Sequence, residues 1–439
     1  MKNRSAILLL FSANIISGFA QGITMIAIPW YFVNMVREAS LFGVIYGGVT
    51  FATLFWGLYT GTLIDKYNRK NIFMITSLCG GIILVISSGV GYFSGQIPLF
   101  FAGLVFAATF LIYSIHYPTL YAFAHEISEP KDYARITSLI EIMGQTTNMI
   151  SGALATILLA GGTGEGMGGE WLVEIFPFAA RRWELHEVFL LDGITYILAI
   201  GLIAFIRFKP IAVRKPESGT IWERFITGYN FLKKYPLILI FGTSSFSVFV
   251  TIMIVGYQVV PLYIDKWLGR GADVFAASEI FFAGGAVLAG IVTTTLFRGR
   301  SAVIAVIIMS VVAALTYFAG SLNSYVPLFY FLYFILGLSN ASVRIMRITH
   351  LFHLIPNYIF GRTGGVFGVI NLILRFSFIG LFSLPLFAEN KNVIFSFPIL
   401  GLFILFSIIP LMLFYGKLNS FKPPQSEQGK DDYESGMQV

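Results

Sequence analysis

Residues 61–70 read Gly-Thr-Leu-Ile-Asp-Lys-Tyr-Asn-Arg-Lys, a charged stretch between two long apolar runs at 40–64 and 71–93. Each run is long enough for a membrane-spanning helix, which needs about 20 apolar residues. Across all 439 residues only 12% are charged and 56% are hydrophobic, whereas soluble domains carry about 25% charged residues. So few charges cannot cover a water-exposed surface. This excludes a cytosolic enzyme, a nucleic-acid-binding protein and a disordered chain.

Twelve apolar runs of this kind follow one another along the chain. Because the runs are long and continuous, they favour helices over the strands of a barrel. We therefore predict an all-α polytopic membrane protein with twelve transmembrane helices. The spans are expected near 6–35, 40–64, 71–93, 98–123, 136–160, 188–207, 237–264, 274–297, 302–320, 326–352, 363–387 and 392–416.

The distribution of basic residues predicts the orientation. Twelve spans place both termini on one side of the membrane. Of the 29 Lys and Arg residues, 20 then fall on that side, 6 on the other and 3 within spans. Cytoplasmic loops are the ones enriched in Lys and Arg. We expect a multi-pass protein of the cytoplasmic (cell inner) membrane with both termini in the cytoplasm.

The connections divide the chain into two halves. We expect a six-helix bundle at 1–207, a cytoplasmic linker at 208–236 with an amphipathic helix on the membrane surface, a second six-helix bundle at 237–416 and a disordered tail at 417–439. One outward loop, at 161–187, is unusually long. Its apolar stretch predicts a short interfacial helix, and its role is left open.

Two short matches relate the halves. Ile-Pro-Trp-Tyr at 28–31 corresponds to Val-Pro-Leu-Tyr at 260–263, and the segment from His125 to Thr137 corresponds to that from His353 to Thr363. Repeats of this kind, with a binding site between them, are typical of secondary transporters. Chance recurrence of Pro and Tyr in apolar helices is the alternative.

The stretch at 61–70 resembles the loop signature of the major facilitator superfamily, G-x-L-x-D-[RK]-x-G-[RK]-[RK]. Six of the seven specified positions match, and Asn68 replaces a glycine. Asn tolerates positive φ better than most residues, so the tight turn can survive this replacement. The resemblance implies the major facilitator fold, in which two pseudo-symmetric six-helix bundles surround a central cavity.

Within that superfamily the chain is similar to the macrolide-efflux type of drug:proton antiporter. The resemblance rests on residues 63–70, on Gly-Leu-Ser at 337–339 and on Gly361-Arg362. The antiporter motif of the fifth span, with Gly-Pro in its middle, is not intact, because the chain reads Ser-Gly-Ala at 151–153.

The resemblance also implies a conformational gate that braces the outward-facing state, formed by Gly61, Asp65, Arg69 and Lys70. Gly61 would let its helix approach a neighbour closely. Asp65, at a helix end, is expected to seek cationic or helix N-terminal partners. The alternative is that Arg69 and Lys70 are plain cytoplasmic anchors.

Ionisable residues inside spans are costly and mark pathways or paired groups. Glu141 and Glu279 are the proton-coupling candidates, because a carboxyl in a partly dry site can bind and release a proton as its exposure alternates. Glu141 is preferred, since Gln145 and Asn148 extend its polar helix face. Asp192, close to the outer interface, is expected to be solvated.

Spans 1, 4, 7 and 10 line the central cavity in the superfamily, which implies that His116, Arg344 and Arg347 face it. A basic inner vestibule would attract an anionic or zwitterionic substrate, and an ion-pair network with Glu141 is the alternative. Amide and aromatic groups suit amphipathic ligands, although packing explains an aromatic stripe equally well. The remaining candidates for the substrate cavity are Gln21, Tyr113, Tyr117 and Gln258.

These features predict a secondary active transporter that exports small amphipathic organic molecules by alternating access and is driven by protons. Its expected partners are the substrate, protons and the lipid bilayer, with the chain as a monomer. The alternatives are an exporter or flippase for a native metabolite, siderophore or lipid, and a transport-inactive receptor or scaffold. No Walker, His-Glu-x-x-His or Gly-x-Ser-x-Gly sequence is present, so we expect no enzyme, metal, cofactor or nucleic acid.

Overall fold

The structure is a computed structural model that describes residues 3–128, 133–160, 181–208, 221–389 and 391–421. Most of the outward loop, for which the sequence predicts an interfacial helix, lies outside these ranges. The tail from 422 onward, expected to be disordered, also lies outside them. The described residues form helices and no strand.

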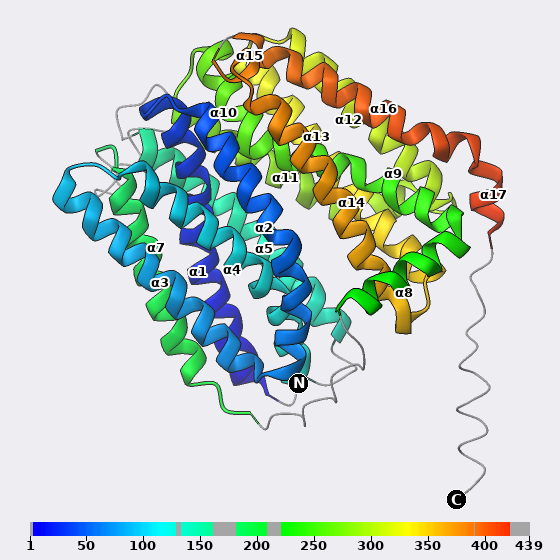
Figure 1. Cartoon of the computed structure of the whole chain (residues 1–439), viewed down its shortest axis with the longest axis horizontal. Helices are drawn as coiled ribbons and strands as arrows, with labels where there is room; N and C mark the ends of the chain where they lie inside the picture. Colours follow the sequence, from blue (N-terminus) through cyan, green and yellow to red (C-terminus); the bar gives the residue numbers. More distant parts are fainter. Residues whose placement is uncertain (1–2, 129–132, 161–180, 209–220, 390, 422–439) are drawn as a thin grey trace, which may run out of the picture.

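The first six spans form one bundle, coloured blue to green in Figure 1. The first span continues from an α-helix into a π-helical segment, and the others are single helices. The elements are α1 (Arg4–Trp30) with η1 (Tyr31–Met35), α2 (Ala39–Lys66), α3 (Arg69–Ser94), α4 (Leu99–Glu126), α5 (Tyr133–Ala160) and α7 (Leu185–Ala204).

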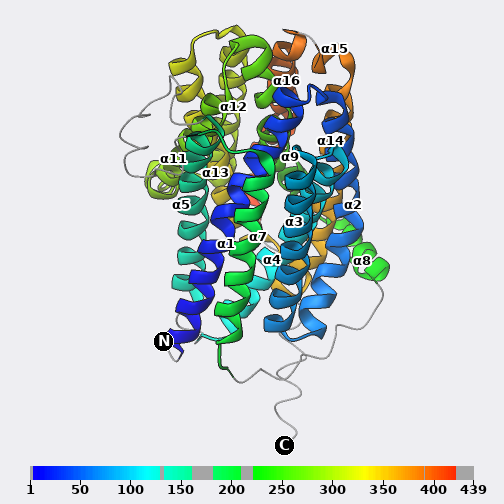
Figure 2. The same ribbon diagram turned by 90° about the vertical axis from the view of Figure 1, so that its left-hand side faces the viewer.

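The linker helix α8 (Ile221–Lys234) leads into the second bundle, which Figure 2 shows behind the first. Its first span is composite, with α9 (Pro236–Ile254), η4 (Val255–Val259), α10 (Val260–Leu262) and η5 (Tyr263–Leu268) in one line. The others are α11 (Ala272–Leu296), α12 (Ala302–Leu322), α13 (Val326–Leu354), α14 (Asn357–Ser383) and α16 (Ser396–Leu413). Shorter elements are α15 (Pro385–Ala388), η6 (Lys391–Phe395) and α17 (Tyr415–Ser420).

The helix lengths confirm the predicted fold class. Within the described ranges, ten helices are long and apolar enough to cross a membrane. The other two spans, α2 and α5, contain 28 residues each, about 42 Å at 1.5 Å per residue, which exceeds the roughly 30 Å of a bilayer core. The chain is therefore an all-α membrane protein with two six-helix bundles.

The predicted internal repeat has a structural counterpart. Tyr31 and Tyr263 each open a π-helical segment directly after the repeated Pro motif. The Tyr31 hydroxyl donates to the carbonyl of Ile97, between α3 and α4, at 2.6 Å. The Tyr263 hydroxyl donates to the carbonyl of Asn323, between α12 and α13, at 2.7 Å. In each bundle, the equivalent tyrosine therefore joins the end of the first span to the loop between the third and fourth spans.

The two ends of the molecule differ. We call the end where α1 begins and α14 begins the base, and the end where α1 and α14 finish the crown. The bundles meet towards the crown and diverge towards the base, where α8 also lies (Figure 1). The most extensive contacts between bundles join α2 to α14 and α5 to α11.

Close helix packing inside the second bundle depends on two glycines. Gly285 of α11 faces the backbone carbonyl of Phe334, and Gly337 of α13 faces that of Phe282. A Cβ at either position would overlap the opposing backbone. Small residues that allow such close approach are characteristic of helix pairs in membranes. Gly337, noted in the sequence for family resemblance, thus has a packing role.

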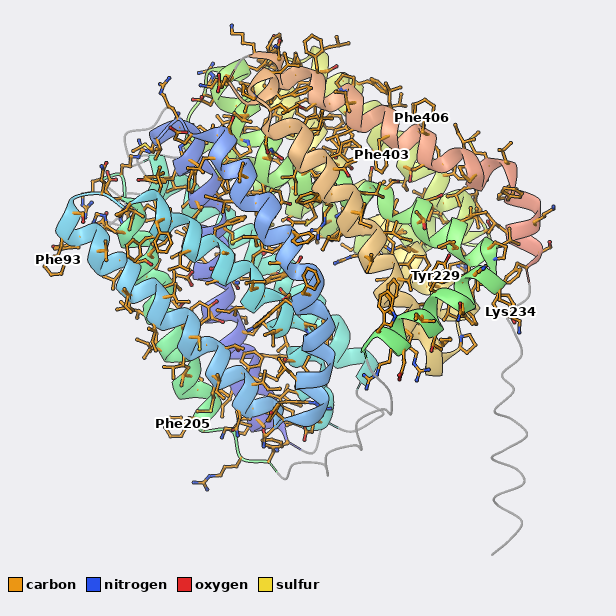
Figure 3. The ribbon with its side chains drawn as sticks, viewed as in Figure 1. Phe93, Phe205, Tyr229, Lys234, Phe403 and Phe406 are labelled. Carbon is orange, nitrogen blue, oxygen red and sulfur yellow. The ribbon has the colours of Figure 1, made fainter. Side chains whose placement is uncertain are left out.

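The outer surface of the bundles is apolar. Phe93, Phe205 and Phe406 project away from the bundles (Figure 3), and Phe93 is 93% exposed. A water-soluble protein does not expose apolar surface on this scale. This face is therefore suited to contact lipid.

The turn before α3 forms with Asn68 in the glycine position of the signature. Asn68 does not use positive φ there, because its φ is −61°. Its side-chain oxygen instead accepts a hydrogen bond from the backbone N–H of Lys70 at 2.9 Å. Asn68 is the N-cap of α3, a position for which Asn is among the preferred residues.

The linker helix α8 packs on the base of the second bundle. Gly228 lies so close to the backbone of Arg362 that a Cβ would overlap it. Leu232 is buried, whereas Trp222 and Tyr229 are exposed, and Tyr229 points outward in Figure 3. The buried face of α8 therefore packs against α14, and its outer face carries two exposed aromatic rings. The position of this helix on the membrane surface stays a prediction.

Candidate functional site

The crown is closed by direct contacts between the bundles. The Asn34 side-chain amide donates to Asp265 at 2.8 Å, and the rings of Trp30 and Phe275 stack with centroids 6.0 Å apart. In contrast, the ion pair and hydrogen bonds described at the base stay within one bundle. The structure is therefore closed at the crown.

A layer of polar side chains lies just below this closure. It consists of Tyr46 (α2), Tyr257 (η4), Glu279 (α11), Tyr333 (α13) and Arg375 (α14), and we call it the central layer. Each residue is about 10–16 Å from the crown end of its span, at 1.5 Å per residue. Both bundles contribute, so the layer spans the boundary between them.

Specific contacts hold the central layer together. The Tyr46 hydroxyl donates across the boundary to the carbonyl of Met253 at 2.8 Å. The Tyr333 hydroxyl donates to Glu279 at 3.2 Å. Tyr257 lies within electrostatic range of both Glu279 and Arg375. An acid and an arginine thus approach the same phenol from different helices.

Aromatic rings surround the phenols. The ring of Tyr257 lies 5.6 Å from that of Tyr46, 6.1 Å from that of Phe106 and 5.9 Å from that of Phe110. We call these four residues the ring cluster. Ligand sites combine an apolar wall with a few polar groups. The ring cluster and the central layer together provide this combination.

Some predicted cavity residues lie nearer the base. Tyr113 of α4 is 47% exposed and lies within electrostatic range of Arg344 on α13. The rings of Tyr113 and Tyr117 are 4.5 Å apart. Gln21 on α1 is partly buried. The predicted aromatic stripe of α4 and the arginine of α13 are therefore brought together across the boundary.

Two other predicted cavity residues make contacts that fix them in place. His116 Nε2 is 2.8 Å from the Asn14 side-chain oxygen, and the His116 ring packs 4.3 Å from that of Phe73, inside the first bundle. Gln258 donates to the carbonyl of Ile379 at 3.2 Å and to the hydroxyl of Ser383 at 3.0 Å. These contacts favour packing roles.

Arg347 is also held inside one bundle. Its side chain donates to the carbonyl of Ser245 at 3.1 Å and lies over the Phe246 ring, 3.8 Å from the centroid. The residue is 5% exposed. A carbonyl and an aromatic face are typical partners of a buried guanidinium. This environment binds α13 to α9.

The acidic candidates fall in different environments. Glu279 is partly buried in the central layer, whereas the Glu141 side chain lies outside the described residues. The prediction that Asp192 is solvated is wrong, because it is 0% exposed and accepts a hydrogen bond from Thr24 at 2.7 Å. Its helix begins about two turns earlier, and α1 covers it from the side.

The predicted gate is only partly described. The surroundings of Gly61 and the side chain of Asp65 lie outside what the structure describes. Arg69 forms an ion pair with Glu126 of α4 at 2.8 Å. The Lys70 ammonium donates to the carbonyls of Ala204 and Ile206, at 2.8 and 2.9 Å. Lys70 therefore satisfies carbonyls that the end of α7 leaves without a helical partner.

Two residues of the central layer escaped the sequence prediction. Tyr46 and Tyr333 are tyrosines in apolar helices, in a chain with 21 Tyr and 44 Phe, and no pattern separates them from packing residues. Arg375 is visible in the sequence as a charge inside a span. Which way its side chain faces depends on the rotation of α14, and the sequence does not give that rotation.

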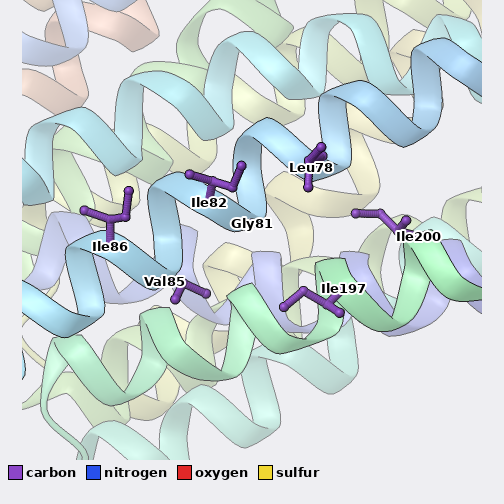
Figure 4. Close-up of a pocket in the computed structure, with 7 residues that line it drawn as sticks. All are labelled: Leu78, Gly81, Ile82, Val85, Ile86, Ile197 and Ile200. Carbon is purple, nitrogen blue, oxygen red and sulfur yellow. The ribbon is translucent and has the colours of Figure 1, made fainter.

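Two other kinds of site can be compared with the central layer. No group of three or more His, Cys, Asp or Glu in the described part of the chain could hold a metal ion. A groove of about 250 Å³ lies between α3 and α7 (Figure 4), and its side chains are all apolar. Because it offers no polar group to orient a ligand, it is a weaker substrate site than the central layer.

Comparisons with known proteins agree with this architecture. A family model described as Major Facilitator Superfamily matches residues 10–383. A search for individual curated relatives found no match. The chain is similar to a bacterial homolog of the human lysosomal transporter Spinster, in an inward-facing and unoccupied conformation, with a TM-score of 0.68 and 13% identity, over 93% of this chain and 96% of that one.

Two further solved structures are similar at comparable identity. The nucleoside transporter NupG gives a TM-score of 0.66 with 12% identity, over 95% of this chain and 100% of that one. A D-xylose–proton symporter gives 0.64 with 13% identity, over 95% and 98%. Identities this low establish the fold alone. The family model spans most of the sequence, and the chain therefore belongs to the major facilitator superfamily.

Proposed function

We propose that this protein is a proton-coupled secondary transporter that exports small amphipathic organic molecules by alternating access. The observation that carries this proposal is the central layer with its ring cluster. It combines an acid, an arginine and phenols at the boundary between two bundles. A site at such a boundary changes its exposure when the bundles rock.

The orientation follows from the basic residues. Lys and Arg are enriched on the side that holds both termini, and this side corresponds to the base. The positive-inside rule then assigns the base to the cytoplasm. In this orientation the structure represents a state closed to the outside, from which an exporter loads its substrate.

The residues at the start of α3 suit a bundle that moves as one body. Arg69 ties α3 to α4, and Lys70 ties α3 to the end of α7. Both contacts lie within the first bundle, so rocking leaves them intact. The resemblance assigns Gly61 and Asp65 to the gate that closes the base in the opposite state.

Glu279 is the proton site that the described contacts support. It is the acid of the central layer, it has one hydroxyl donor and it lies at the boundary, next to Gly152 of α5. The name of the D-xylose–proton symporter among the structural neighbours supports the proton as the coupling ion. Glu141, the candidate preferred from the sequence, becomes the second candidate, because its side chain lies outside the described residues.

The substrate path leads from the base to the central layer. Tyr113, Tyr117, Gln21 and Arg344 offer aromatic and polar groups along it. This combination suits a molecule with an apolar body and polar substituents. The resemblance to the macrolide-efflux type places macrolides in the ligand panel.

Transport by purified protein in liposomes tests the proposal. A panel of macrolides and amphipathic dyes is measured with and without a pH gradient, and the gradient is expected to drive at least one of them. Asp65→Asn should impair transport while the protein stays folded in the membrane. Glu389→Gln, which removes an exposed acid, is the control. Normal transport by Asp65→Asn would contradict the gate, and the absence of gradient-driven transport would contradict the function.

A further inference from the structure

Arg375 occupies the point where the two bundles part. On α14, Ile379 lies against Gly47 of α2, and Phe376 lies with its ring 5.9 Å from that of Phe51. Arg375 is one helical turn before Ile379 and shares its face. It also lies within electrostatic range of Tyr46 and Tyr257. Its guanidinium therefore belongs to the central layer.

The guanidinium has few partners for its charge. Its Nε atom is buried and has no hydrogen-bond partner in the described part of the chain, and no ion pair there involves Arg375. Arginine keeps its charge in proteins, so Arg375 cannot become neutral by losing a proton. A charge at membrane depth requires an anion, a carbonyl or water.

Arg347 shows what a satisfied arginine looks like in the same bundle. It has a backbone carbonyl and an aromatic face as partners. Arg375 has neither in the described contacts, although both residues lie inside apolar helices. The difference indicates that Arg375 is kept for a partner other than its own chain.

The surroundings indicate what that partner is. Two rings of the cluster, those of Tyr46 and Tyr257, lie within electrostatic range of the guanidinium. The partly buried rings of Phe110 and Tyr257 offer an apolar wall. A planar guanidinium binds carboxylate or phosphate oxygens in a two-pronged geometry. The ligand would then place its anionic group on Arg375 and its ring system in the cluster.

We propose that Arg375 is the anion-binding residue of the substrate site, and that the substrate is a small aromatic or otherwise apolar molecule with an anionic group. This inference rests on the proposed transport function and specifies its substrate class. It excludes purely cationic lipophilic molecules as the preferred substrates.

Binding of three probes with the same ring tests the inference. The probes are 2-naphthoate, 2-naphthamide and 2-naphthylmethylammonium, and calorimetry measures their affinity for the purified full-length protein in neutral detergent. The wild type should prefer the carboxylate. Arg375→Gln should weaken carboxylate binding at least about tenfold and leave the amide within about twofold. Arg298→Gln, which removes an exposed arginine at the base, should change neither.

Other outcomes overturn the inference. Equal loss for carboxylate and amide would make Arg375 a packing residue, and a wild type without preference for the carboxylate would remove the anion site. If Arg375→Gln does not fold, Arg375→Lys, which keeps the charge but not the planar fork, should still lower carboxylate affinity.

Two further measurements separate a lipid headgroup from a substrate as the anion, and the anion site from the transport function. In nanodiscs, phosphatidylglycerol that displaces 2-naphthoate from the wild type would reassign Arg375 to a lipid headgroup. Carboxylate binding that depends on Arg375, in a protein that shows no gradient-driven transport in liposomes, would refute the proposed function and leave the anion site standing.

Discussion

Two acids inside spans of this molecule have similar depth and different surroundings. Asp192 of α7 and Glu279 of α11 each lie about two turns from the crown end of their helices, and each accepts one hydroxyl hydrogen bond, from Thr24 and Tyr333 respectively. Asp192 is sealed between helices of one bundle, whereas Glu279 lies at the boundary between bundles. Depth and burial alone therefore do not identify a coupling residue.

The difference matters for the proposed alternating access, in which the bundles would move as units. The extensive packing between α1 and α7 would then keep Asp192 and Thr24 together. Glu279 faces α5 and Tyr257, and those neighbours are expected to change when the crown opens. We therefore expect proton coupling at Glu279 and a structural role for Asp192.

The largest expected effect is that of Glu279→Gln. The amide keeps the shape and can still accept from Tyr333, but it cannot carry a proton. Transport driven by a pH gradient should fall at least about tenfold, equivalent to about 1.4 kcal/mol, while gradient-independent substrate exchange persists. Both are measured in proteoliposomes. Full gradient-driven transport by the variant would move the coupling site elsewhere.

Thr24→Val should have the next largest effect, on stability. It removes the one donor that the structure gives Asp192, whose Oδ1 atom already lacks a partner in the described residues. Buried hydrogen bonds in membrane proteins contribute about 0.6 to 2 kcal/mol, so the midpoint of thermal unfolding should fall.

Thr316→Val is the matched control for Thr24→Val. In the described part of the chain, the Thr316 hydroxyl bonds only to a carbonyl of its own helix, at 2.8 Å, and that carbonyl remains available to the helix ladder. A smaller loss is expected. Equal loss in both variants would show that the Thr24–Asp192 contact has no particular importance.

Asp192→Asn should have a smaller effect still. Asparagine can accept from Thr24 through its carbonyl oxygen, and the single donor already suits a neutral group better than a charged one. Stability should change by less than about 1 kcal/mol, with gradient-driven transport close to that of the wild type. Loss of gradient dependence on the scale of Glu279→Gln would place the proton path through the first bundle.

The fold could be predicted largely from the sequence, because each span is recognisable from its own apolar composition. The repeat was also visible, since Tyr31 and Tyr263 follow Pro at equivalent places and make equivalent hydrogen bonds. Such features depend on neighbours along the chain. They need no knowledge of which helix lies opposite.

The central layer could be read only in part, because it depends on helix rotation and on partners from other helices. Glu279 was a candidate as an acid inside a span, but Tyr46 has no local feature that distinguishes it from the other tyrosines. Asp192 was misjudged for the same reason. The sequence predicted the distance of Asp192 from the helix end about correctly. It could not predict that α1 buries this side chain, because that contact does not depend on α7 alone.

Tyr333→Phe is the smallest expected effect and the sharpest test of how Glu279 works. The change removes the 3.2 Å hydrogen bond to Glu279 and leaves the ring packed against Phe282 and Phe329, at 5.4 and 5.6 Å between centroids. A long hydrogen bond in a membrane protein contributes about 0.6 kcal/mol or less. The unfolding midpoint should therefore hardly move, and transport should fall by no more than about threefold. If Tyr333→Phe instead loses gradient-driven transport as fully as Glu279→Gln, the phenol hydroxyl is itself a station on the proton path, and coupling belongs to the pair rather than to the acid alone.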